Sequence, residues 1–148
     1  MITCYELMRG PKLEVKNEYD FKEILSNPED IADMCREVFC MGELAEEQAV
    51  LLAMDTDSKI MGAFKLSKGN TDSTIVDIQS IFTRLLLCGS KRMILAHNHP
   101  SQNKTPSKYD IKVTQKLKKA CDMMNFIFMD HIIVTKSSMF SFFAEGLI

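Results

Sequence analysis

The sequence predicts an α/β fold in which a mixed β-sheet is sandwiched by helices. Short apolar runs typical of strands alternate with segments of helical period, turn residues separate them, and no repeat, linker or low-complexity segment interrupts this order. With 148 residues, the chain can bury roughly 70% of its unfolded surface and needs only one core. Hydrophobic residues make up 46% and charged residues 26% of the chain, as in ordinary globular proteins.

The first 42 residues are expected to form an accessory segment with one helix. Residues 1–17 give only weak strand signals. Ser26-Asn27-Pro28 is typical of a helix start, because a capping residue precedes a Pro in the first turn. Apolar residues then recur at helical spacing until Gly42, and these are Ile31, Met34, Cys35 and Val38. The main domain is expected over residues 43–148.

A β-hairpin and a second helix are expected next. Six of the residues between Glu47 and Asp55 are apolar on both alternating faces, which is typical of a central strand. A polar turn then leads to a second strand over residues 60–66. Asp77 is a candidate cap for a helix that Gly89 ends. The apolar residues of that helix are Ile78, Ile81, Phe82, Leu85 and Leu86.

The stretch after residue 91 carries residue types typical of a metal site. Residues 92–96 form a mostly apolar strand that ends at His97-Asn98-His99, and histidines at i and i+2 of an extended chain project to the same side. The helix that follows Ser107 places Asp110 on its apolar face. The apolar residues of that face are Val113, Leu117, Ala120, Cys121 and Met124. Two imidazoles and an inward carboxylate predict a Zn²⁺ site that keeps a fourth position for water, whose pKa the ion lowers to about 7.

A second interpretation of the same residues stays open. Ser107-x-x-Asp110 is also typical of a capping box, in which both side chains satisfy free N–H groups at a helix start. In that case Asp110 is a structural residue and not a ligand. The His-x-His pair beside an inward carboxylate favours the metal site for the group as a whole.

Closing strands are expected over residues 126–135 and 139–143. Asp130-His131 lies among apolar residues of the first of these strands. We expect His131 to be a buried histidine bonded to the backbone, since this is the common role of a histidine in an apolar strand. The alternative is that Asp130 or His131 forms a hydrogen bond with the other ring nitrogen of a metal-bound imidazole.

These motifs resemble those of a known family. His97-x-His99-Pro100 followed by Ser107-x-x-Asp110 is similar to the JAMM signature of JAB/MPN zinc metallopeptidases and isopeptidases. Further segments resemble the RadC branch, which is sometimes labelled a DNA repair protein. They are residues 94–101, 105–107, 130–134 and 141–146. The resemblance covers residues 43–148 and implies the cytidine-deaminase-like JAB/MPN fold, with Zn²⁺ held by His97, His99 and Asp110.

The resemblance also implies a reaction, the hydrolysis of an amide bond by metal-activated water. Its general base and acid is a Glu on an early strand, and the matching residue here is Glu47. The residues alone do not choose between Glu43, Glu46 and Glu47. Ser107 would steady the oxyanion. A protein or peptide substrate is therefore expected.

The chain departs from the RadC pattern at three places. Gln102 replaces a Gly of the site loop, so we expect the turn that Gly permits to be shaped differently. Ile78-Gln79-Ser80 replaces a Pro-Arg-Glu, which removes a basic side chain. No helix-hairpin-helix segment precedes residue 43, so the chain is expected to be a short form.

Charge and cysteine content indicate further properties. The five cysteines are odd in number and show no Cys-x-x-Cys spacing, and no long apolar run is present, so a cytoplasmic protein without disulfides is expected. The alternative function is a DNA-associated binding module with weak or no catalysis, contacting DNA through Lys108, Lys112 and Lys119. A net charge of −2 argues against strong DNA binding. The zinc deaminase pattern of His-x-Glu and Pro-Cys-x-x-Cys is absent.

Overall fold

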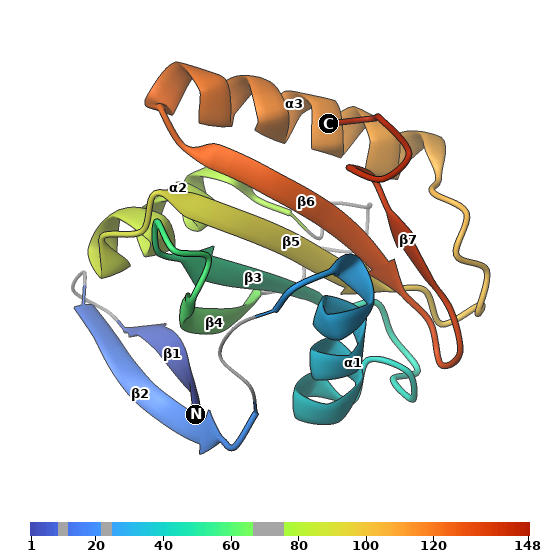
Figure 1. The fold of residues 1–148 in the computed structure, drawn as a ribbon, viewed down its shortest axis with the longest axis horizontal. Helices are drawn as coiled ribbons and strands as arrows, with labels where there is room; N and C mark the ends of the chain where they lie inside the picture. Colours follow the sequence, from blue (N-terminus) through green and yellow to red (C-terminus); the bar gives the residue numbers. More distant parts are fainter. Residues whose placement is uncertain (9–11, 22–24, 67–75) are drawn as a thin grey trace.

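The computed structural model describes residues 1–8, 12–21, 25–66 and 76–148, and it confirms the α/β fold (Figure 1). The elements are β1 (Ile2–Met8), β2 (Lys12–Tyr19), α1 (Pro28–Phe39), β3 (Ala49–Met54), β4 (Ile60–Leu66), α2 (Ile78–Cys88), β5 (Arg92–Asn98), α3 (Lys108–Met124), β6 (Ile127–Val134) and β7 (Met139–Ser141). Within the described residues the strands form a seven-stranded mixed sheet of order β2-β1-β4-β3-β5-β6-β7. Parallel pairing joins β5 to β6 and β1 to β4, and the other neighbours are antiparallel.

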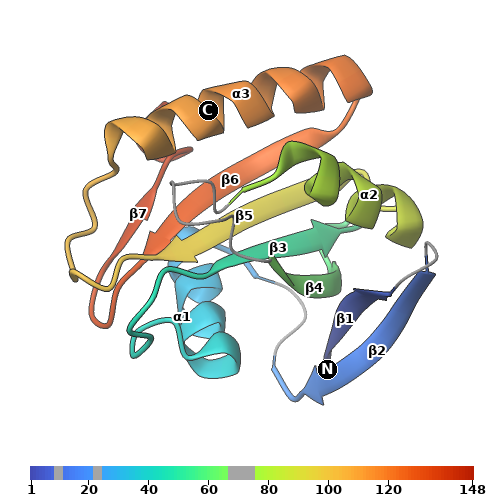
Figure 2. The ribbon, with the colours of Figure 1, turned by 180° about the vertical axis from the view of Figure 1, so that it is seen from behind.

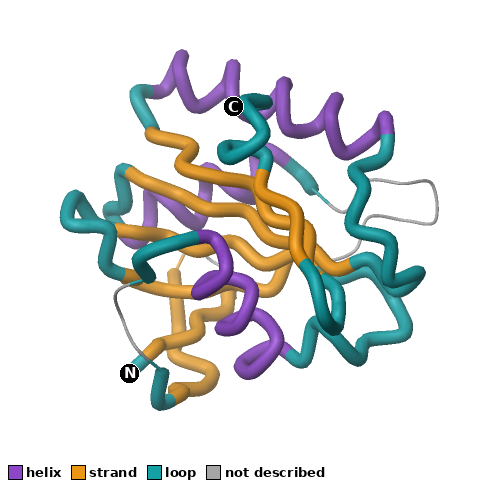
Figure 3. Tube along the Cα trace, turned by 45° about the vertical axis from the view of Figure 1, so that its right-hand side comes forward, coloured by secondary structure: helices purple, strands orange, loops and turns teal. Residues whose placement is uncertain are grey.

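The sheet lies between two layers of helices. Helix α1 covers one face, and α2 and α3 cover the other (Figures 1 and 2). Figure 3 shows the strands as the layer between them. Strand β3 is buried on both faces because its side chains alternate: Val50 and Leu52 pack in the α1 core, and Leu51 and Ala53 pack in the α2/α3 core. The central strand that the sequence predicts is thus confirmed.

Local capping signals set the helix ends. The side chain of Asn27 accepts a hydrogen bond from the Asp30 N–H, and that of Asp77 accepts one from the Ser80 N–H, so both predicted helix starts are confirmed. Gly89 ends α2 in the left-handed conformation, with φ of 70°. Helix α1 ends before the expected Gly42, because Cys40 already takes a left-handed φ of 55°.

The N-terminal residues contribute more than the weak strand signals indicated. Strands β1 and β2 pair along their length as an antiparallel hairpin, and Cys4 pairs with Ala63 of β4. Leu13 and Val15 alternate with polar residues in β2, but most of this strand is exposed, and Val15 is 58% exposed. This short alternation is therefore only a weak strand signal. Ile2 and Cys4 share the α1 core with residues of β3 and β5. The division between residues 1–42 and 43–148 stays a prediction.

None of the described helices is both long and apolar enough to cross a bilayer. The cysteines are free, as expected, and they are Cys4, Cys35, Cys40, Cys88 and Cys121.

A buried carboxylate holds the corner between β6 and the C-terminal segment. Asp130 is 4% exposed. Its Oδ1 accepts hydrogen bonds from the N–H groups of His131 (2.7 Å) and Phe143 (2.9 Å), and the Ser141 hydroxyl donates to Oδ2 (2.5 Å). Burial raises the pKa of Asp130, although these donors act in the opposite direction. Asp130 therefore anchors this corner and does not touch the imidazoles of the site.

We expect Asp130→Ala to lower the free energy of unfolding by about 2–4 kcal/mol, because it leaves buried donors without an acceptor. Denaturant unfolding followed by circular dichroism measures this change. The matched control is Asp122→Ala on α3, which removes an exposed pair with Lys118 and should cost less than about 1 kcal/mol. Equal losses in the two variants would contradict the anchoring role.

Candidate metal centre

Strand β5 and helix α3 bring the predicted ligands to one place. Met93 and Leu95 of β5 pack in the core beneath α2 and α3. Because side chains alternate along a strand, His97 points to the same face. His99 lies one residue beyond the strand, and α3 begins over this face and carries Asp110 in its first turn.

The ligand atoms of these three residues converge. His97 Nε2 lies 3.3 Å from Asp110 Oδ1, and His99 Nε2 lies 3.3 Å from Asp110 Oδ2. The two Nε2 atoms are 3.0 Å apart. One ligand atom from each residue can be chosen so that all lie within 4.8 Å of one another. The side chains are only 4%, 10% and 13% exposed for His97, His99 and Asp110.

Asp110 also closes the capping box. The Asp110 N–H donates to the Ser107 hydroxyl oxygen at 3.0 Å, and the Ser107 N–H donates to Asp110 Oδ2 at 2.7 Å. The capping box is therefore confirmed, and a role for Asp110 as a metal ligand stays a prediction. The two roles are compatible because a carboxylate has two oxygens and about four lone-pair sites.

The Nδ1 atoms of His97 and His99, which point away from Asp110, each have a hydrogen-bond partner. His99 Nδ1 lies 2.7 Å from the Asn103 carbonyl oxygen. His97 Nδ1 lies 2.8 Å from His131 Nε2, and His131 Nδ1 lies 2.6 Å from the Thr114 hydroxyl. The burial expected for His131 is confirmed at 1% exposure. The expected bond from this ring to the backbone is wrong, because α3 brings the Thr114 hydroxyl to Nδ1 and β5 brings His97 to Nε2.

The titratable groups of the site influence one another's pKa values. A hydrogen bond with Asp110 raises the pKa of His99, while burial acts in the opposite direction. Burial alone would raise the pKa of Asp110, but its contacts with the imidazoles of His97 and His99 outweigh burial and hold this pKa well below its usual range. Burial lowers the pKa of His131 well below that of a free histidine, and His97 adds to this effect. Asp110 is therefore an anion, and the Nε2 atoms of two imidazoles lie against its carboxylate.

The donor set fits a metal ion. A carbonyl oxygen only accepts, so His99 donates from Nδ1 to Asn103, and a neutral His99 then keeps its lone pair on Nε2. That lone pair faces the Asp110 carboxylate and the second imidazole. Two imidazole nitrogens and a carboxylate are ligands that Zn²⁺ accepts, whereas Ca²⁺ and Mg²⁺ prefer all-oxygen sites. His97, His99 and Asp110 could therefore hold a metal ion.

Glu47 lines a cavity together with two of the predicted ligands, His99 and Asp110. This cavity of about 390 Å³ is lined by residues of the ligand loop, the start of α3 and the segment before β3. Its lining includes Glu47, His99, Ser107 and Asp110. Glu47 lies two residues before β3 begins at Ala49, so it is a loop residue beside the strand and not part of it. The structure thus brings Glu47 and Ser107 together with the ligand group.

The amide of Asn98 fixes the backbone on both sides of Glu47. Its Oδ1 accepts a hydrogen bond from the Gln48 N–H at 2.6 Å, and its Nδ2 donates to the Glu46 carbonyl oxygen at 3.0 Å. Asn98 is 1% exposed. No role for Asn98 is predicted from the sequence, although a polar residue between two histidines at the end of a buried strand is a usable signal.

The site loop keeps a left-handed residue at Gln102. Its φ is 64°, a conformation that costs a residue other than Gly about 1 kcal/mol or more. The Gln102 side-chain oxygen accepts a hydrogen bond from the Lys136 N–H at 2.8 Å, and its own N–H donates to the His99 carbonyl oxygen at 2.9 Å. Gln102 itself thus takes a left-handed conformation of the kind that Gly permits, and the expectation of a differently shaped turn stays a prediction.

The outer face of α3 carries exposed lysines. Lys108, Lys112 and Lys119 are exposed, while Leu117 and Cys121 are buried against the sheet. The prediction that Met124 lies on the buried face is wrong. Met124 is 47% exposed, because it is the last residue of the helix. DNA contact through the lysines stays a prediction.

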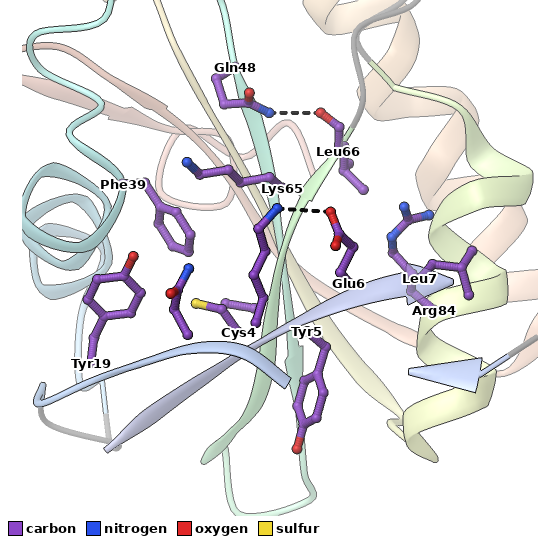
Figure 4. A pocket seen from close by; sticks show the side chains of 13 residues that line it. Cys4, Tyr5, Glu6, Leu7, Tyr19, Phe39, Gln48, Lys65, Leu66 and Arg84 are labelled. Atoms are coloured by element: carbon purple, nitrogen blue, oxygen red, sulfur yellow. Dashed lines mark hydrogen bonds and ion pairs between the residues drawn. The ribbon is translucent and has the colours of Figure 1, made fainter. Parts of the chain in front are cut away.

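A larger cavity of about 640 Å³ lies between β1, β2, β4 and α1 (Figure 4). Its lining includes the Lys16–Glu6 ion pair, with a distance of 2.9 Å from Nζ to Oε1. Gln48 also lines it and donates to the Leu66 carbonyl oxygen at 2.8 Å (Figure 4). Its lining holds no histidine. We therefore place the candidate chemistry in the smaller cavity.

Comparisons with known proteins agree with this geometry. The family model described as RadC-like JAB domain matches residues 25–147. A UPF0758 protein from Flavobacterium johnsoniae is 36% identical over 107 residues, which cover 72% of this chain and 47% of the relative. One from Finegoldia magna is 34% identical over 134 residues, covering 89% and 58%. One from Actinobacillus pleuropneumoniae is 38% identical over 103 residues, covering 68% and 47%. The chain spans about half the length of these relatives.

Proposed function

The chain belongs to the RadC-like JAB family, and from this we propose that it is a zinc-dependent hydrolase of peptide or isopeptide bonds. The observation that carries the proposal is the convergence of His97, His99 and Asp110 on one point. Glu47 and Ser107 line the cavity beside that point. A ligand group with an adjacent carboxylate and hydroxyl is what metal-assisted hydrolysis of an amide requires.

His97, His99 and Asp110 would hold the ion. A zinc ion in such a site supplies Lewis-acid activation of water and of the scissile carbonyl. Glu47 would accept a proton from the attacking water and pass it to the leaving amine, since Glu47 lines the cavity and Asn98 fixes the backbone of its two neighbours.

Ser107 would stabilise the developing oxyanion. Its hydroxyl oxygen already accepts a hydrogen bond from the Asp110 N–H. A hydroxyl that accepts can still donate its own proton, and Ser107 lines the cavity where a substrate carbonyl would lie. The capping box thus also fixes the position of this donor relative to the ligand group.

The first test is metal content, measured by inductively coupled plasma mass spectrometry on protein purified without chelator. We expect about one zinc per chain, the stoichiometry of a three-ligand site. Zinc at about 1,000 times its Kd should raise the free energy of unfolding by about 4 kcal/mol. Mg²⁺ at the same concentration is the control and should have no effect, because the site offers two nitrogen donors.

Hydrolysis is then tested on a panel of peptide and isopeptide-linked substrates. Cleavage that a chelator abolishes and zinc restores would support the proposal. Folded protein that binds no zinc, or cleavage that a chelator leaves unchanged, would contradict it.

A further inference from the structure

A chain of buried hydrogen bonds runs behind the candidate metal centre and connects two of its ligands. It starts at the Asp110 carbonyl oxygen, passes through the Thr114 hydroxyl and both ring nitrogens of His131, and ends at His97 Nδ1. Thr114 and His131 are each 1% exposed. Neither lines the cavity that contains Glu47 and Ser107, so neither has direct access to a substrate there.

The direction of the first bond follows from the chemistry of its partners. The Thr114 hydroxyl oxygen lies 2.7 Å from the Asp110 carbonyl oxygen, which can only accept, so the hydroxyl donates its single proton there. The same oxygen lies 2.6 Å from His131 Nδ1. With its proton already given to Asp110, Thr114 can only accept from His131. His131 therefore carries a proton on Nδ1.

The second direction follows from the first. A neutral imidazole with its proton on Nδ1 carries a lone pair on Nε2. His131 Nε2 lies 2.8 Å from His97 Nδ1, so His97 must donate from that nitrogen. The His97 lone pair is then on Nε2, the atom that lies 3.3 Å from Asp110 Oδ1 and 3.0 Å from His99 Nε2.

Packing keeps the middle member of this chain in place. The His131 ring stacks on Phe142, with ring centroids 4.6 Å apart and an angle of 11° between the planes. Its strand, β6, is paired along β5, where Leu95 lies opposite His131. The ring therefore has little freedom to turn away from His97.

We propose that Thr114 and His131 are positioning residues that hold His97 in the tautomer whose Nε2 lone pair faces the ligand group. This inference rests on the proposed function, because the tautomer of His97 matters for function only if the ligand group binds a metal ion. Thr114 acts on two ligands, because its hydroxyl also holds the backbone of Asp110. His99 reaches the same tautomer independently through the Asn103 carbonyl oxygen. Partners behind a metal-bound imidazole typically set its tautomer and change affinity for the ion by 10- to 100-fold when lost.

The tautomers can be observed directly in metal-free protein. The chain has three histidines, so ¹⁵N labelling of histidine gives a simple spectrum of ring nitrogens. At mildly alkaline pH we expect His131 and His97 each to show a protonated, pyrrole-type Nδ1 and an unprotonated, pyridine-type Nε2. A protonated Nε2 on His131 in the unchanged protein would overturn the proposal, whatever the variants show.

The matched variants are Thr114→Val, which removes the hydroxyl, and Thr114→Ser, which keeps it. Without the hydroxyl, His131 loses its acceptor at Nδ1, so we expect its proton to move to Nε2 and that of His97 to follow. Zn²⁺ affinity, measured by competition with a chromogenic chelator, should then fall about 10- to 100-fold. Thr114→Ser should keep both the spectrum and the affinity.

A second control separates this role from an ordinary structural one. Thr83 of α2 makes the same kind of bond, from its hydroxyl to the Gln79 carbonyl oxygen four residues earlier at 2.9 Å. Thr83→Val should leave the spectrum and the Zn²⁺ affinity unchanged. Unchanged histidine signals in Thr114→Val would overturn the proposal. Absence of zinc binding in the unchanged protein would instead contradict the proposed function, and the metal-free spectrum would still decide the tautomers.

Discussion

Asp110→Asn is expected to remove zinc from the protein while helix α3 stays folded. The substitution keeps the shape of the side chain and one oxygen, which can still accept the Ser107 N–H of the capping box. It removes the anion that lies 3.3 Å from the Nε2 atoms of both histidines. Affinity for Zn²⁺ should fall more than about 100-fold, beyond the typical effect of losing a partner behind the ligands.

Two measurements on the same sample test this expectation. Metal content and chelator competition report the ion, and far-ultraviolet circular dichroism with denaturant unfolding reports the helix. In the metal-free protein the circular dichroism signal should show that α3 stays folded, because the cap retains its acceptor. Asp122→Asn, at an exposed position of the same helix, is the matched control and should keep its zinc. Full zinc occupancy in Asp110→Asn would leave Asp110 as a capping residue alone.

Glu47→Gln is expected to abolish hydrolysis while zinc remains bound. Glutamine has the size of glutamate but cannot accept and return a proton at this position. The loss of a general base and acid typically lowers the rate by about 10² to 10⁴. His97, His99 and Asp110 are untouched, so the metal content should not change. The rate constant on a cleaved substrate and the zinc content are measured together.

Glu43→Gln is the matched control for this prediction. Glu43 is one of the acidic residues between which the sequence alone does not choose, and its carboxylate pairs with Lys136 at 2.9 Å. The Glu43→Gln variant should retain the activity of the unchanged protein. Full activity in Glu47→Gln, or loss of activity in Glu43→Gln instead, would assign the proton transfer to another residue.

The fold was predictable where its signals are local. The periods of α1, α2 and α3 and the capping residues Asn27 and Asp77 mark the helices because each depends on neighbours within a few residues. The β1–β2 hairpin was not predictable in the same way. Its second strand is largely exposed and shows apolar alternation only at Leu13 and Val15, which is too short a pattern to identify a strand with certainty.

The residues of the candidate site likewise differ in whether local signals predict them. His97, His99, Ser107 and Asp110 stand close in the sequence, and a strand end followed by a helix start was enough to predict that they meet. Glu47 was found only through the family resemblance, since its neighbour Glu46 has the same local surroundings. Its place depends on Asn98, which contacts Gln48 across 50 positions of the chain.

By itself the sequence therefore determined the types of ligand, their order and the elements that carry them, because residue type, period and capping are local properties. The tertiary structure decided which atoms face one another. The pairing of β5 with β6 brings His131 to His97 across 34 positions, and the placement of α3 brings Thr114 to His131. Such contacts depend on strand register and helix docking, which the sequence encodes only through the packing of the whole core.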